Sequence, residues 1–132
     1  MPILTTTAAD AALLAAAFKD PTRLVVACLC AAWCDTCEEF KATFQRLAGA
    51  DPASTYVWID IEDDSALVGE VDVENFPTLA VFRGGQTLFH GVSLPQQGVV
   101  ARTISAVAQG APARDVPGAV RRLPAALSAR AP

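Results

Sequence analysis

The chain has 132 residues, of which 52% are hydrophobic, and a formal net charge of −4. This length fits one ordinary domain, and the apolar content is ample for a core that needs no disulfide or metal to hold it. Residues 1–110 hold six Lys or Arg against thirteen Asp or Glu, whereas residues 111–132 hold four against one. The acidic body argues against nucleic acid as the main partner, because neutralising phosphate requires clustered Lys or Arg.

The N-terminal stretch MPILTTTAADAALLAAAF contains an Ala/Leu run, but no Lys or Arg precedes it and Asp10 lies at its start. It therefore lacks the basic region of a secretory signal peptide, and we expect a mature, cytoplasmic protein. Thr7 and Asp10 have capping-box spacing, and the apolar residues that follow predict a helix over residues 8–18.

Two almost wholly apolar runs, residues 23–30 and 54–61, are typical of strands buried on both faces of a sheet. Between them, apolar residues recur at helical intervals from Cys34 or Asp35 onward until Gly49, which predicts an amphipathic helix. The longest apolar run, Leu24 to Trp33, is well short of the roughly 20 residues that span a bilayer, so we expect no membrane helix.

In the second half, Gly84-Gly85 separates two further apolar runs, residues 78–83 and 86–92, and predicts an antiparallel hairpin. Three weaker patterns predict a short helix at 65–69, a closing helix at 95–109 and an edge strand in ILTT, residues 3–6.

Strands that alternate with helices imply a parallel core, to which the hairpin adds antiparallel strands. We therefore expect an α/β fold, a three-layer sandwich with a mixed central sheet flanked by helices, over residues 1–110. Residues 111–132 hold four of the nine prolines and only a short helical fragment, so we expect a flexible Pro/Ala/Arg-rich tail.

The stretch AAWCDTCEEF, residues 31–40, places Cys34 and Cys37 between a buried strand and the start of a helix. Unpaired N–H groups and the positive end of the helix dipole stabilise thiolate at such a position, and thiolate is the form that attacks disulfides. Cys34 is therefore the expected catalytic nucleophile, and Cys37, one turn further on, is the expected resolving cysteine.

The order of WCDTC after a strand, FPTL with Pro77 43 positions after Cys34, another strand and a Gly-rich hairpin resembles the thioredoxin family over roughly residues 5–110. The resemblance implies a thiol–disulfide oxidoreductase that needs no cofactor in the domain itself. It also implies a cis Phe76-Pro77 bond facing the cysteine pair, with Phe76 pairing its backbone with a client and Trp33 packing against that client.

Three departures from the family pattern stand out. Asp35-Thr36 replaces the usual Gly-Pro between the cysteines, and Ala42 replaces a helix-kinking proline. Cys28 and Trp58 stand where the family places a buried acid and a lysine, so the usual proton acceptor is missing, with Asp60, Glu62 or water as substitutes.

The negative charge of Asp35, Glu38 and Glu39 opposes thiolate on Cys34 and therefore favours a less oxidising couple. We therefore expect a reductant of protein disulfides. The same charge should discourage glutathione, an anion, so a flavoprotein reductase is the expected electron donor.

Other interpretations remain open from the sequence. The fold could serve as a binding or adaptor module without redox turnover. A metal site is possible by count, with four cysteines as ligands: Cys28, Cys30, Cys34 and Cys37. However, Cys28 and Cys30 lie in a predicted strand, and we interpret them as small buried hydrophobes. The alternative for Cys30 is an auxiliary redox role. We expect no catalysis from His90 and no metal at the acidic run 60–64.

Overall fold

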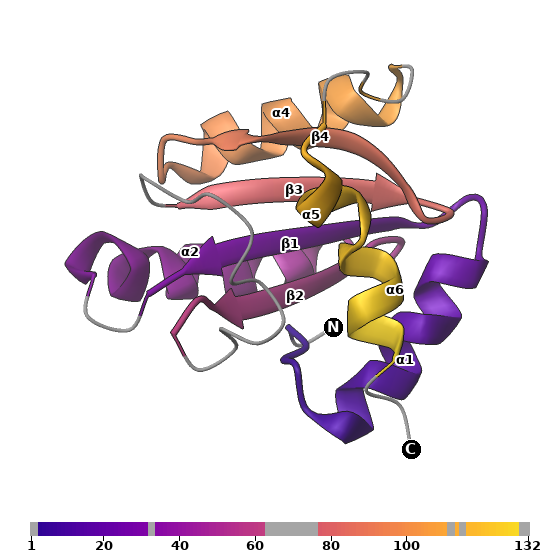
Figure 1. The fold of residues 1–132 in the computed structure, drawn as a ribbon. Helices are drawn as coiled ribbons and strands as arrows, with labels where there is room; N and C mark the ends of the chain where they lie inside the picture. The colour runs from indigo at the N-terminus through magenta and orange to yellow at the C-terminus, as the bar shows by residue number, and fades with distance from the viewer. Residues whose placement is uncertain (1–2, 32–33, 63–76, 111–112, 114–115, 130–132) are drawn as a thin grey trace.

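The computed structural model describes residues 3–31, 34–62, 77–110, 113 and 116–129 (Figure 1). Within them the chain forms helices and strands in the order α1 (Ala8–Lys19), β1 (Leu24–Cys30), α2 (Asp35–Ala50), β2 (Thr55–Asp60), β3 (Thr78–Arg83), β4 (Gln86–Val92), α4 (Gln97–Ala108), α5 (Gly118–Arg121) and α6 (Leu123–Ser128).

The four strands form one mixed sheet in the order β2-β1-β3-β4. β1 pairs in parallel with β2 and antiparallel with β3, and β3 pairs antiparallel with β4. All seven residues of β1 are buried, as its unbroken apolar sequence predicted. At the outer edge of β2, Leu4 forms a single parallel bridge with Val57, so the expected edge strand is reduced to one bridging residue.

Helices cover both faces of the sheet and make the three layers that the sequence predicted (Figure 1). Side chains of α1, α5 and α6 pack on one face, where Leu14, Phe18 and Leu127 are buried. Side chains of α2 and α4 pack on the other face, where Phe44 and Val100 are fully buried. The predicted fold class is therefore confirmed.

Two local predictions are also confirmed. Thr7 is the N-cap of α1, and its hydroxyl accepts a hydrogen bond from the backbone N–H of Asp10 at 3.3 Å. Gly84 and Gly85, between β3 and β4, have φ of 59° and 83°. Positive φ at both central residues is what a type I′ hairpin turn requires, and it explains the glycine pair.

The C-terminal segment differs from the mobile tail that we expected. Residues 118–128 form α5 and α6, and α6 lies against α1 (Figure 1). The physical reason is a set of apolar residues at helical spacing, which the prolines obscured and which are buried in the core: Val116, Val120, Leu123 and Leu127.

The helix expected at 65–69 lies outside the described residues. None of the helices in the described part of the chain combines the length and the apolar character that crossing a bilayer requires.

Candidate active site

The cysteine motif lies between the end of β1 and the start of α2. Cys30 is the last residue of β1, and Cys34 is the N-cap of α2, with extended backbone angles of φ −89° and ψ 116°. The carbonyl of Cys34 accepts from the N–H of Glu38 at 3.1 Å, the first hydrogen bond of the helix. Cys34 is half-buried, whereas Cys37, in the first turn, is 1% exposed. Cys34 is thus the more accessible of the two motif cysteines.

The disulfide in the structure joins Cys30 to Cys37, and Cys34 carries a free thiol. The Cα atoms of Cys30 and Cys37 are 5.8 Å apart, within the usual range for a disulfide. The sequence predicted that Cys37 pairs with Cys34 and favoured a small buried hydrophobe at Cys30, with an auxiliary redox role as the alternative, whereas the structure bonds Cys30 to Cys37. The position of Cys30 was a signal for this pairing: it ends β1 five residues before α2 starts, on the sheet face that α2 covers.

Cys28 lies beside this disulfide but is not part of it. Its Sγ is 3.7 Å from the Sγ of Cys30, and its side chain is fully buried on the same face of the sheet. Burial raises the pKa of the Cys28 thiol well above its ordinary value. Cys28 therefore stays protonated at neutral pH.

The next strand supplies an indole opposite Cys28. The register pairs Cys28 with Trp58 and Cys30 with Asp60, so the four side chains share one face of the sheet. Trp58 packs on Phe44 with ring centroids 5.8 Å apart, and the Lys41 ammonium lies 5.6 Å from its ring centroid. Cys28 and Trp58 are thus neighbours in the sheet. They carry a thiol and an indole at the two positions where the family resemblance implies a buried acid and a lysine.

Pro77 directly precedes β3, which pairs with β1 through Thr78 and Leu29. It is buried, and its carbonyl accepts from the N–H of Ser93 at 3.0 Å. This register brings Pro77 to the end of β1 that carries Cys30. Trp33 and Phe76 lie outside the described residues, and the cis geometry of the Phe76-Pro77 bond stays a prediction.

The first turn of α2 is polar and acidic on its outer side. Asp35, Thr36, Glu38 and Glu39 are exposed, and two of them, Asp35 and Glu38, place carboxylates at the end of the helix where backbone N–H groups are unpaired. The negative charge expected beside Cys34 is therefore carried by carboxylates that are exposed to solvent.

The one histidine of the chain lies elsewhere. His90 lies on β4, paired with Ala80 on the face that α1 covers, away from the cysteine face. Among the described residues, no group of three or more His, Cys, Asp or Glu is arranged to hold a metal ion.

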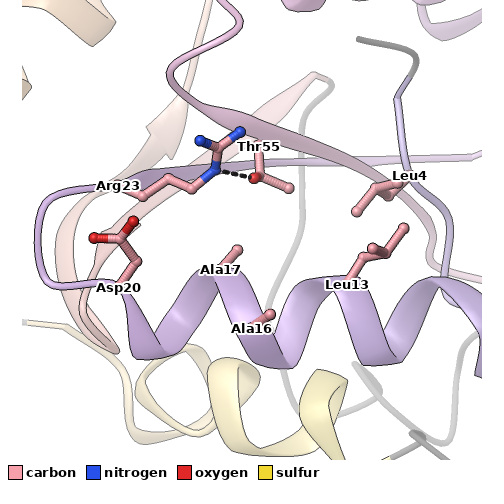
Figure 2. Close-up of a pocket in the computed structure, with 7 residues that line it drawn as sticks. All are labelled: Leu4, Leu13, Ala16, Ala17, Asp20, Arg23 and Thr55. Atoms are coloured by element: carbon pink, nitrogen blue, oxygen red, sulfur yellow. Dashed lines mark hydrogen bonds between the residues drawn. The ribbon is translucent and has the colours of Figure 1, made fainter.

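A hollow of about 230 Å³ lies at the opposite end of β1, between α1 and the edge of the sheet (Figure 2). In it the guanidinium of Arg23 points to Thr55 and donates to its hydroxyl at 2.7 Å, while hydrogen bonds from Thr22 lower the pKa of the Asp20 carboxyl. The hollow lies at the start of β1, so it takes no part in cysteine chemistry at the strand's end. Its lining residues are Leu4, Leu13, Ala16, Ala17, Asp20, Arg23 and Thr55.

Comparison with known proteins gives a consistent family assignment. A family model described as thioredoxin matches residues 5–106. Among curated proteins, the bovine (Bos taurus) protein disulfide-isomerase A4 is 30% identical over 76 residues, which cover 54% of this chain and 12% of that protein. Thioredoxin H2-1 of rice (Oryza sativa subsp. japonica) is 30% identical over 70 residues, which cover 53% of this chain and 51% of that protein. The matches thus span about half the length, or less, of these relatives.

Solved structures share the fold at lower sequence identity. The germline-specific thioredoxin Deadhead from Drosophila melanogaster aligns with a TM-score of 0.65 at 21% identity, over 80% of this chain and 98% of that chain. A poplar thioredoxin h mutant aligns with a TM-score of 0.70 at 19% identity, over 84% of this chain and 86% of that chain.

Proposed function

Because this chain belongs to the thioredoxin family, we propose that it is a thiol–disulfide oxidoreductase that reduces the disulfides of client proteins. The observation that carries the proposal is the position of two cysteines at one helix start: Cys34 half-buried at the N-cap of α2, and Cys37 buried one turn further on. An accessible thiol beside a shielded one is what a two-step exchange needs.

In the first step, the Cys34 thiolate attacks one sulfur of a client disulfide. The client disulfide breaks, a mixed disulfide with Cys34 forms, and the other client sulfur leaves as a thiolate that takes up a proton. In the second step, Cys37 loses its proton and attacks the Sγ of Cys34, which forms a Cys34–Cys37 disulfide and releases the second client sulfur. Two electrons pass from the protein to the client.

The client groove is proposed from the family resemblance. Trp33 packs against the client, a cis Pro77 shapes the groove, and the backbone of Phe76 pairs with the client chain. The position of Pro77 supports this, since β3 begins beside the end of β1 that carries the cysteines.

The direction of exchange follows from charge. The exposed carboxylates of Asp35 and Glu38 disfavour a negative sulfur on Cys34, which makes the couple less oxidising. A reductant needs a supply of electrons, for which we propose a flavoprotein reductase, and it works in a reducing compartment such as the cytoplasm.

The test is the reduction potential of the protein, measured by equilibration with defined thiol/disulfide buffers and by counting reactive thiols. We expect a value near about −270 mV or below, as in thioredoxin, and Cys34→Ser should abolish turnover of a disulfide substrate such as insulin. A value near −120 to −180 mV, roughly the range of strong oxidants and isomerases, would contradict the reductant role.

Client trapping is the complementary measurement. Reduced Cys37→Ser protein should accumulate mixed disulfides through Cys34, because the resolving thiol is gone, and the double variant with Cys34→Ser is the matched control that should accumulate none.

A binding module without redox turnover is the alternative, and the thiol and indole in place of the family's acid and lysine favour it. In that case Cys34→Ser would leave the biological activity intact, whereas the same substitution would inactivate a reductase.

A further inference from the structure

All four cysteines of the chain meet at one place in the interior. Cys28, Cys30 and Cys37 are buried in the core between the sheet and α2, and Cys34 packs against the same cluster from the surface. Cys37 is bonded to Cys30, although it lies in the first turn of the helix that Cys34 caps. Cys37 thus has two candidate partners: Cys30, to which it is bonded, and Cys34, three residues earlier at the start of the same helix.

We infer that Cys30 is a third exchange cysteine, which takes Cys37 from a surface Cys34–Cys37 disulfide and stores the disulfide in the interior as Cys30–Cys37. The inference rests on the proposed function, because client reduction is what generates the Cys34–Cys37 disulfide.

The exchange is balanced and needs no further reagent. Cys30 loses its proton and attacks the Sγ of Cys37, so that the Cys30–Cys37 bond forms as the Cys34–Cys37 bond breaks. Cys34 leaves as a thiolate and takes up a proton, and the number of disulfides is unchanged. The structure assigns this step to Cys30 and not to Cys28, because Cys37 is bonded to Cys30 while Cys28 keeps a free thiol.

The exchange moves the disulfide from the surface into the interior, where it is shielded from solvent. Both sulfurs of the stored disulfide belong to residues that are at most 1% exposed, so a reductant in solution cannot attack them directly. Cys34 is the half-buried cysteine of the cluster, so it must attack Cys37 first and bring the disulfide back to the surface. The oxidised protein thus keeps a free thiol at its active site, and re-reduction of the Cys30–Cys37 disulfide depends on Cys34.

Disulfide mapping of the full chain tests this directly. The protein is equilibrated with oxidised and reduced dithiothreitol, quenched with acid, alkylated in denaturant and cleaved after Trp33 and before Asp35. These two cuts place Cys30, Cys34 and Cys37 on separate fragments. We expect Cys30 linked to Cys37 in most of the oxidised molecules, with Cys34 alkylated.

Two strand variants form a matched pair, because both cysteines are buried in β1 on the same face. Cys30→Ser should move the disulfide to Cys34–Cys37 and protect Cys34 from alkylation. Cys28→Ser should leave the Cys30–Cys37 disulfide in place. In Cys34→Ser, reduction of the Cys30–Cys37 disulfide by dithiothreitol should slow at least tenfold, which thiol counting over time measures.

Wild-type protein that yields only Cys34–Cys37, with Cys30 alkylated, would overturn the inference while leaving the proposed reductase intact. Unslowed reduction in Cys34→Ser would overturn the role of Cys34 as the point of entry. Failure of the proposed function looks different: Cys34→Ser would retain insulin reduction, or no reversible disulfide would form at any position.

Discussion

At the scale of single residues, the interior beside Cys37 is less polar than the family pattern predicts. A buried acid in this place can accept a proton, whereas the Cys28 thiol, with its pKa raised by burial, is already protonated at neutral pH. The proton that Cys37 loses must therefore reach another group. Asp60, in register with Cys30 on the same face of the sheet, is the carboxylate that the strand pairing brings to this end.

His90 makes stability depend on pH. Burial lowers its pKa below 6.5, and its Nε2 is buried without a hydrogen-bond partner among the described residues. Because the folded pKa is depressed, the unfolded chain binds the proton more readily once the pH falls through about 6.5. The stability that neutral His90 permits is therefore complete above that pH and is lost progressively below it.

We expect the free energy of unfolding, measured by urea denaturation, to fall between pH 7 and pH 5.5. His90 is the only histidine in the chain, so His90→Asn should flatten the dependence in this window. Equal slopes for the variant and the wild type would show that another group titrates there.

At the scale of elements, two glycines allow one substitution to be compared in opposite settings. Gly85 has φ +83° in the hairpin turn and Gly49 lies in α2, and an added Cβ meets nothing within 4 Å at either position. Gly85→Ala should cost about 1–2 kcal/mol, since positive φ disfavours a side chain, whereas Gly49→Ala should stabilise by up to about 1 kcal/mol through helix propensity.

Urea denaturation of both variants at one pH measures the difference. Steric clashes do not explain an opposite sign, because both sites have room for the methyl group. A loss of stability at Gly49 equal to that at Gly85 would contradict the conformational explanation.

Most elements could be predicted because each rests on a local pattern. Continuous apolar runs predicted β1 and β2, helical spacing predicted α1 and α2, and the glycine pair predicted the hairpin. The Cys30–Cys37 pairing could not be predicted in this way, because it depends on how α2 sits against the end of β1. Spacing along the chain favours Cys34 as the partner of Cys37, whereas packing brings Cys30 to the same sulfur.

At the scale of the whole molecule, the C-terminal segment completes one face of the sandwich. Composition pointed to a mobile tail, because prolines and a reversal of charge begin near residue 111. Burial depends instead on a few apolar side chains at helical spacing, and three of these, Val120, Leu123 and Leu127, are at most 1% exposed against the core that α1 also covers. The segment therefore contributes to the stability of the domain.

Two Leu→Ala variants test that contribution with the same change of side chain. Leu127, in α6, is fully buried in the core, whereas Leu13, in α1, is 54% exposed. Leu127→Ala should cost about 2–5 kcal/mol through lost burial and the cavity left behind. Leu13→Ala should stay within about 0.5 kcal/mol of the wild type, as surface substitutions do. Urea denaturation with the cysteines held in one redox state measures both. If Leu127→Ala costs no more than Leu13→Ala, α6 adds nothing to the core, and residues 111–132 behave as the tail that their composition suggested.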